Sequence, residues 1–349
     1  MQISSKQKRL IRLFINYVLG PVLFAWVSYS IYRQLRGQSD LQRSWTHIRA
    51  AFGSTLRWNL LAVVALMLVN WSVETIKWKI AIKRIQTVSF FTAFKAVLSG
   101  VSFSVSTPNR VGEYLGRVLY MEEGKRIKAI SLTIAGSVSQ LLVTLLVGFA
   151  GLGLLRQKIE ESGMSSSFWM DVLLYGVFTT ILILTLFYFR LPWVVKWIDR
   201  LPASRKFAWI IEALEDFNAT LLLQMLSLSA LRYVVFVIQY FLLYRLFNVD
   251  ISWGQCWPAV SVSFLIMAVI PTIALFTDLG LRGTISLKLV GLFSPNSLGI
   301  GLTAATIWFI NLIIPALAGS LLILSVKKVF RAGEDPVANT QRGKNSIQH

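Results

Sequence analysis

The stretch that decides the fold is residues 129–155, AISLTIAGSVSQLLVTLLVGFAGLGLL, which contains no charged side chain. A helix of about 20 largely apolar residues is long enough to cross the ~30 Å hydrocarbon core of a bilayer. Residues 129–155 therefore predict a membrane-spanning helix.

Seven further apolar segments of similar kind occur along the chain, at roughly 10–32, 58–76, 90–107, 170–189, 229–247, 255–276 and 298–326. Apolar residues make up 55% of the 349 residues and charged residues only 15%, against about 25% charged in ordinary soluble domains. The sequence therefore predicts an all-α, polytopic membrane protein with about eight membrane segments, and it excludes an ordinary soluble fold.

The charge balance is strongly basic, with 35 Lys and Arg against 16 Asp and Glu. The basic residues lie mostly in short stretches between apolar segments, which is typical of the positive-inside bias and of attraction to anionic lipid head groups. We therefore expect membrane lipids as partners and no nucleic acid. A single cysteine, Cys256, and two histidines exclude an internal disulfide framework and a Cys/His metal site. The sequence also lacks Walker A and GxSxG motifs, so we expect neither a metal nor another cofactor.

Two of the apolar segments, 90–107 and 255–276, differ from the rest. The first contains Lys95 and ends in Ser-Val-Ser-Thr-Pro, and the second contains two prolines; each leads into a polar stretch with glycine and then an apolar helix. Interrupted segments at corresponding places in two halves indicate a binding site made of discontinuous helices. We therefore expect both segments to meet near the membrane midplane, either as re-entrant segments or as full crossings.

The same order predicts a single transmembrane domain over 1–330, in two pseudo-symmetric halves at about 1–155 and 156–330, and a polar, disordered tail over 331–349. With six full crossings, the stretches predicted to be cytoplasmic hold 23 Lys and Arg: the N-terminus, 77–84, 110–128, 190–206 and the tail from 327. The opposite stretches, 33–57, 156–158 and 282–288, hold nine. This places both termini in the cytoplasm. Residues 33–57 and 193–228 have the pattern of amphipathic helices on the membrane surface.

The stretch 107–117, Thr-Pro-Asn-Arg-Val-Gly-Glu-Tyr-Leu-Gly-Arg, gives the clearest candidate site. Thr107 can cap a helix that begins at Pro108, the favoured position for proline. Three charged residues of this helix share one face, and two glycines permit close backbone approach: Arg110, Glu113 and Arg117, with Gly112 and Gly116. At membrane depth the arginines would suit a phosphate. The alternative is a surface ion pair in a cytoplasmic loop.

A second candidate is Asp278 with Arg282, four residues apart and next to Gly280 and Gly283. Buried charges in a membrane are expensive unless paired, so they indicate function, whereas in a plain loop they indicate little. Other polar residues have simpler interpretations: Glu74 beside Lys77 as an interface pair, Arg232 and Arg245 as anchors, and Asn311 with Pro315 as a helix kink.

The run Pro108-Asn-Arg-Val-Gly-Glu113, with Arg117 after it, resembles the first signature of the lysylphosphatidylglycerol synthase transmembrane-region family, whose members are described as flippase-like. The run 278–283, Asp-Leu-Gly-Leu-Arg-Gly, resembles the second signature, although it lacks the double glycine and Pro271 lies well upstream. The resemblance covers about residues 5–330. It implies a domain that moves or presents a lipid between leaflets. Larger relatives carry an aminoacyltransferase or accompany glycosyltransferases, and others are linked to isoprenoid or hopanoid lipids.

Three hypotheses follow. The first is a cytoplasmic-membrane transporter that moves an anionic phospholipid or isoprenoid lipid between leaflets, with Arg110 and Arg117 on the head group, Glu113 holding them, and Asp278 and Arg282 serving from the other half. The second is a membrane enzyme or enzyme subunit that acts on a lipid head group; because few residues follow the last apolar segment, we do not expect aminoacylation by this chain alone. The third is a non-catalytic scaffold for an envelope-biosynthesis enzyme.

Overall fold

A computed structural model describes residues 57–105, 107, 111–190, 219–270 and 275–323. Within these ranges the chain is helical and has no strand. The elements are α4 (Arg57–Ile82), α5 (Phe90–Val105), α6 (Gly112–Val118), α7 (Arg126–Glu161), α8 (Ser167–Phe189), α11 (Ala219–Leu246), α12 (Trp253–Val269), α13 (Leu275–Val290), α14 (Ser297–Trp308), η4 (Phe309–Ile313) and α15 (Ile314–Ile323).

Five helices of the described ranges are long and apolar enough to cross a membrane: α4, α7, α8, α11 and the continuous helix formed by α14, η4 and α15. This confirms the prediction of an all-α, polytopic membrane protein. The predictions for 10–32, 33–57 and the tail lie outside the described residues, apart from Arg57 at the start of α4. The predicted boundary at residue 228 was wrong. Helix α11 begins at Ala219, so the end of the predicted surface stretch 193–228 belongs to a long apolar helix.

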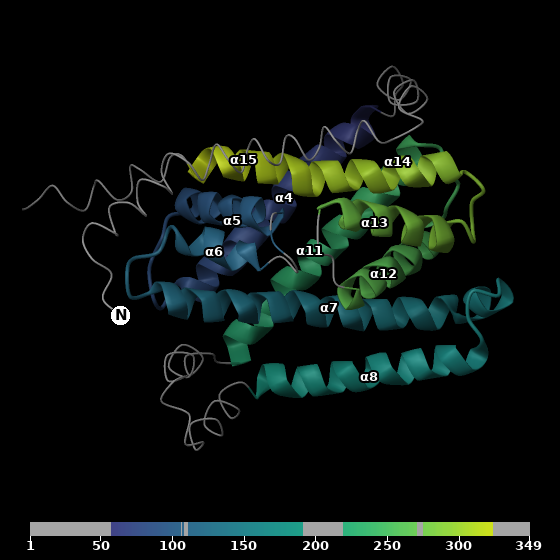
Figure 1. Cartoon of the computed structure of the whole chain (residues 1–349), viewed down its shortest axis with the longest axis horizontal. Helices are drawn as coiled ribbons and strands as arrows, with labels where there is room; N and C mark the ends of the chain where they lie inside the picture. Colours follow the sequence, from purple (N-terminus) through teal and green to yellow (C-terminus); the bar gives the residue numbers. More distant parts are fainter. Residues whose placement is uncertain (1–56, 106, 108–110, 191–218, 271–274, 324–349) are drawn as a thin grey trace, which may run out of the picture.

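The two unusual segments form short helices, each followed by a helix that packs against it. Helix α5 has 16 residues and α12 has 17, which gives lengths of about 24–26 Å, less than the hydrocarbon thickness of a bilayer. Helix α6 packs against α5, and α13 packs against α12 (Figure 1). We refer to these as the α5–α6 and α12–α13 helix pairs.

The helix packing follows the same order in both halves. Helix α4 packs along α11, α5 packs against α15, and α12 packs against α7, so each helix pair lies on a long helix of the other half. Figure 1 shows the two pairs on either side of the crossing helices α4 and α11. The prediction that 90–107 and 255–276 meet does not hold for the main contacts of their described helices, because α5 packs on α15, α6 and α4, and α12 packs on α7, α13 and α11.

Close backbone approach holds these interfaces together. A Cβ added to Gly319 of α15 would lie 1.9 Å from the carbonyl oxygen of Leu98 in α5. A Cβ on Gly148 of α7 would lie 2.8 Å from the side chain of Leu265 in α12. Small residues at such crossings are typical of membrane helix packing, where the hydrophobic effect does not drive helices together.

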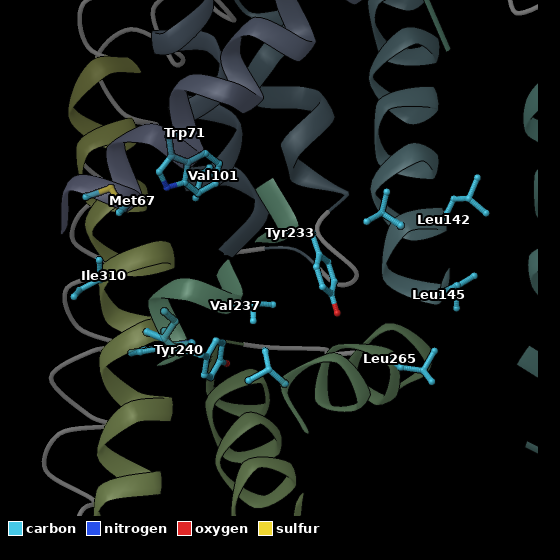
Figure 2. Packing of buried hydrophobic residues seen from close by; sticks show 14 of the residues in the cluster. Met67, Trp71, Val101, Leu142, Leu145, Tyr233, Val237, Tyr240, Leu265 and Ile310 are labelled. Carbon is cyan, nitrogen blue, oxygen red and sulfur yellow. The ribbon is translucent and has the colours of Figure 1, made fainter. Parts of the chain in front are cut away.

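The core between the helices is apolar and aromatic. Figure 2 shows Met67 and Trp71 of α4, with Tyr233 and Tyr240 of α11 farther along the same packed region. Helix α8, by contrast, packs mainly on α7 and leaves most of its apolar side chains exposed. A helix that is apolar around most of its circumference and lies at the edge of a bundle is suited to contact with lipid.

The predicted kink near Asn311 and Pro315 is a π-helical turn, Phe309–Ile313. In a regular helix the carbonyl of Asn311 would accept a hydrogen bond from the N–H of residue 315, but Pro315 has no N–H. Asn311 Nδ2 donates to the carbonyl of Ile307 at 3.3 Å, and this side-chain bond stabilises the irregular turn. The structure thus has a local distortion at the predicted position, formed by insertion of a wider turn.

Candidate functional site

The site is built around Glu74, a carboxylate on α4 with 4% of its surface exposed. Its Oε1 accepts a hydrogen bond from Arg117 Nη2 of α6 at 2.7 Å. Its Oε2 lies 2.9 Å from Lys77 Nζ of the same helix and also accepts from Arg232 Nη1 of α11. One carboxylate therefore links three cations from three helices.

Two further polar side chains complete the arrangement. Glu113, one turn before Arg117 on α6, forms an ion pair with the same Nη2 atom of Arg117. Asn70, one turn before Glu74 on α4, accepts a hydrogen bond from Arg232 Nε at 2.7 Å through Oδ1. We call the five charged residues the Glu74 cluster: Glu74, Lys77, Glu113, Arg117 and Arg232.

Lys77 extends the cluster toward α7. Its Nζ donates to the carbonyl of Gly136 and to the hydroxyl of Ser229, both at 3.3 Å. The hydroxyl of Ser229 lies 2.9 Å from that of Ser139. The ammonium group is thus held by oxygen atoms from three helices.

The cluster lies along the middle of two candidate membrane helices, α4 and α11. Glu74 is eight residues before Ile82, the end of α4, and Arg232 is 13 residues after Ala219, the start of α11. At 1.5 Å per residue these positions are about 12 and 20 Å from the respective helix ends, so a hydrocarbon core of ~30 Å centred on these helices would enclose both. Uncompensated charge at that depth is expensive, so the cluster needs its internal pairing.

The pairing is nevertheless incomplete. Three cations face two carboxylates, which leaves a net charge of +1 in the cluster. Three buried N–H donors in or beside it have no hydrogen-bond partner among the described residues: Arg117 Nε, Asn70 Nδ2 and Trp71 Nε1. An arrangement with excess positive charge and unpaired donors is suited to an anion with several oxygen atoms.

Close packing fixes α6, which carries Glu113 and Arg117. A Cβ on Gly116 would lie 2.5 Å from the backbone of Gly100 in α5, so the two helices touch backbone to backbone. Thr107 Oγ1 accepts from the N–H of Gly112 at 2.7 Å, where α6 begins.

Helix α6 therefore starts at Gly112 and not at the predicted Pro108. Thr107 still accepts a hydrogen bond from the first N–H of this helix. Pro108 and Arg110 lie outside the described residues. The predicted ion pair between Glu113 and Arg117 is present, and Arg117 is buried, which excludes an exposed loop pair for that residue.

Asp278 and Arg282 form a second, separate pair. Arg282 Nη2 donates to Asp278 Oδ2 at 3.3 Å, and Nη1 donates to the hydroxyl of Tyr240 on α11 at 3.0 Å. Tyr240 is eight residues beyond Arg232 on α11, about 12 Å along the helix axis. The Glu74 cluster and the Asp278–Arg282 pair thus involve α11 at two positions along its length, Arg232 and Tyr240, and the structure does not join them into one site. A Cβ on Gly280 or Gly283 would meet no atom within 4 Å, so the described packing does not require glycine there.

The centre of the site was missed by sequence reasoning. Glu74 and Lys77 were interpreted as an interface pair and Arg232 as an anchor, yet all three side chains are at most 11% exposed. The sequence carried one signal for Glu74 and Lys77: both lie at the end of the apolar segment 58–76, which the structure shows to continue as a helix to Ile82. Ionisable residues inside a membrane helix are candidates for function by default. No group of three His, Cys, Asp or Glu side chains in the described ranges could hold a metal ion.

Comparison with known proteins identifies the family. The family model described as the lysylphosphatidylglycerol synthase TM region matches residues 14–319. No curated protein and no solved structure matches the chain. Since the family match covers most of the 349 residues and includes both the Glu74 cluster and the Arg282 pair, the chain belongs to the lysylphosphatidylglycerol synthase transmembrane-region family.

Proposed function

We propose that this protein moves an anionic phospholipid or isoprenoid lipid between the leaflets of the cytoplasmic membrane. The observation that carries the proposal is the Glu74 cluster, a group of buried charges with a net charge of +1 and unpaired N–H donors at membrane depth. A lipid phosphate supplies negative charge and several acceptor oxygens, which these groups lack.

Arginine is suited to this task, because its planar guanidinium can donate two parallel hydrogen bonds to a phosphate. Arg117 and Arg232 would bind the head group from α6 and α11, and Glu113 would hold Arg117 in place. Arg110 of the same family motif is expected to assist. The lipid tails would remain among the apolar side chains that the bundle presents to the bilayer.

The second charged pair gives the head group another position. Arg282 of α13 is held by Asp278 and by Tyr240 of α11. Tyr240 lies farther along α11 than Arg232 of the Glu74 cluster. Rocking of the two halves about α4 and α11 would let the head group pass from one depth to the other.

The alternative of a lipid-modifying enzyme has less support from the site. A general acid or base needs a carboxylate that is free to exchange a proton with its substrate, whereas Glu74 and Glu113 both accept from Arg117. We therefore propose that any enzyme of envelope biosynthesis acting on the same lipid is a partner of this protein. From the distribution of Lys and Arg we also propose that both termini lie in the cytoplasm.

The test is lipid translocation in proteoliposomes. Purified protein is reconstituted with a fluorescent phosphatidylglycerol, a fluorescent polyprenyl phosphate or a fluorescent phosphatidylcholine, and dithionite quenching reports movement between leaflets. We expect movement of at least one anionic lipid and little movement of phosphatidylcholine. The proposal fails if the protein moves no anionic lipid faster than empty liposomes.

A pair of matched variants assigns the movement to the site. Arg117→Lys keeps the charge but loses the guanidinium fork, so we expect a strong loss of transport with retained folding. Arg156→Lys changes an arginine whose ion pairs, with Glu160 and Asp171, are partly exposed, and transport should be retained. Equal transport by both variants would contradict the site assignment.

A further inference from the structure

Glu74 occupies the position that an anionic ligand would need. Its two oxygens receive hydrogen bonds from two guanidinium groups of different helices, Arg117 of α6 and Arg232 of α11. In the ion pairs of the described residues, Arg232 and Lys77 have no carboxylate partner other than Glu74. The carboxylate is therefore the internal anion of the site.

A carboxylate satisfies this site only in part. It has two oxygen atoms, and three cations already share them. Arg117 Nε and Asn70 Nδ2 belong to side chains that are at least nine-tenths buried, and neither nitrogen has a partner in the described structure. A lipid phosphate offers additional acceptor oxygens and would pair donors that Glu74 leaves unpaired.

We propose that Glu74 is an exchangeable counter-ion, which pairs with Arg117 and Arg232 in the empty transporter and is replaced on both by the phosphate of the bound lipid. This inference rests on the proposed function. When replaced, Glu74 remains beside Lys77, its neighbour one turn along α4. Exchange thus keeps every charge paired.

The exchange accounts for selection of anionic lipids. The empty cluster carries a net charge of +1, and a head group with one negative charge brings it to zero. A zwitterionic head group has no net charge and leaves the excess in place. Because uncompensated charge is expensive inside a membrane, the anionic lipid is favoured at this depth.

The exchange also connects binding to movement. In the empty state the carboxylate of α4 joins α6 to α11. After exchange the lipid phosphate joins α6 to α11 directly, and the ionic contacts of α4 with both helices are released. Lipid binding therefore weakens the ionic link of α4 to these two helices, while the hydrogen bond from Arg232 to Asn70 still joins α11 to α4.

The experiment measures phosphatidylglycerol binding by fluorescence anisotropy of a labelled lipid in neutral detergent. Glu74→Gln removes the competing charge at constant size. We expect it to bind phosphatidylglycerol at least about tenfold more tightly than the wild type, since charged hydrogen bonds no longer have to be exchanged. Binding of labelled phosphatidylcholine should not change.

The double variant Glu74→Gln/Lys77→Met guards against misfolding, because it removes one cation together with the carboxylate and keeps the net charge at +1. It should also bind phosphatidylglycerol more tightly than the wild type. Glu122→Gln is the matched control, since Glu122 forms an exposed pair with Lys125, and its affinity should equal that of the wild type.

The result that overturns the inference is a folded Glu74 variant, single or double, that binds phosphatidylglycerol no more tightly than the wild type. Glu74 would then be a fixed structural partner of the arginines. This outcome differs from failure of the proposed function, in which the wild type itself moves no anionic lipid in proteoliposomes.

Discussion

The contact between α15 and α5 gives a stability prediction whose size can be worked from the structure. A Cβ on Gly319 would lie 1.9 Å from the carbonyl oxygen of Leu98 and 2.5 Å from its carbonyl carbon. Neither atom can move without displacing the backbone of α5. Gly319→Ala should therefore push α15 away from the α5–α6 helix pair, which carries Arg117 of the Glu74 cluster.

Gly301→Ala is the matched control, because Gly301 lies on α14 in the same continuous helix and a Cβ there meets no atom within 4 Å. Both substitutions gain the helix propensity of alanine over glycine, up to about 1 kcal/mol, so this gain cancels when the variants are compared. Overpacking of a tight interface costs about 1–3 kcal/mol. We expect Gly319→Ala to be less stable than Gly301→Ala by roughly that amount.

The assay is thermal unfolding of the purified variants in the same detergent, followed by intrinsic fluorescence and by loss of the monodisperse peak in size-exclusion chromatography. Gly319→Ala should unfold several degrees below Gly301→Ala, and Gly301→Ala should match or exceed the wild type. Equal midpoints for the two variants would refute the argument that backbone contact at Gly319 holds α15 on α5.

Three further predictions follow from the charges. Glu74→Ala should destabilise the protein more than Glu113→Ala, by about 2 kcal/mol or more, because Glu74 pairs with three cations and Glu113 with one; thermal midpoints that are equal or reversed would contradict this. Tyr240→Phe removes the hydroxyl that accepts from Arg282 and should slow lipid movement in proteoliposomes without lowering the amount of folded protein; unchanged movement would exclude a role for that contact. A reporter fused after His349 should be cytoplasmic, and a reading on the opposite side would mean that the predicted crossings are miscounted.

The transmembrane helices were predictable from sequence because their signal is local and long. The predicted segment 129–155 corresponds to α7, Arg126–Glu161, and 298–326 corresponds to the continuous helix Ser297–Ile323. One error is at the end of α4, where charged residues lie inside a helix. Helix α4 continues past Glu74 and Lys77 to Ile82. Arg117 and Arg232 of other helices compensate the charge of Glu74, and hydropathy alone does not predict such partners.

The candidate site likewise has one part that the sequence predicts and one part that it does not. The Glu113–Arg117 pair was predictable, because residues four apart on a helix are neighbours. The link from Arg117 to Glu74 spans 43 residues of sequence and that from Arg232 to Glu74 spans 158. Helical periodicity predicts contacts between residues three or four apart and gives no information on contacts between residues so far apart in the sequence. Only the packing of α11 and of the α5–α6 helix pair on α4 brings the three residues together.

Buried ion pairs between helices also affect the count of loop charges from which membrane orientation is predicted. Lys77 and Arg117 were counted as residues of cytoplasmic loops, whereas both are buried among helices and paired with Glu74. Arg282, counted on the opposite side, is likewise paired inside the bundle. Removing these residues from both sets leaves the bias toward the cytoplasmic side, so the predicted orientation does not depend on them. The positive-inside rule concerns charges that stay in water near the membrane surface, and a cation with a buried carboxylate partner belongs to the chemistry of the site instead.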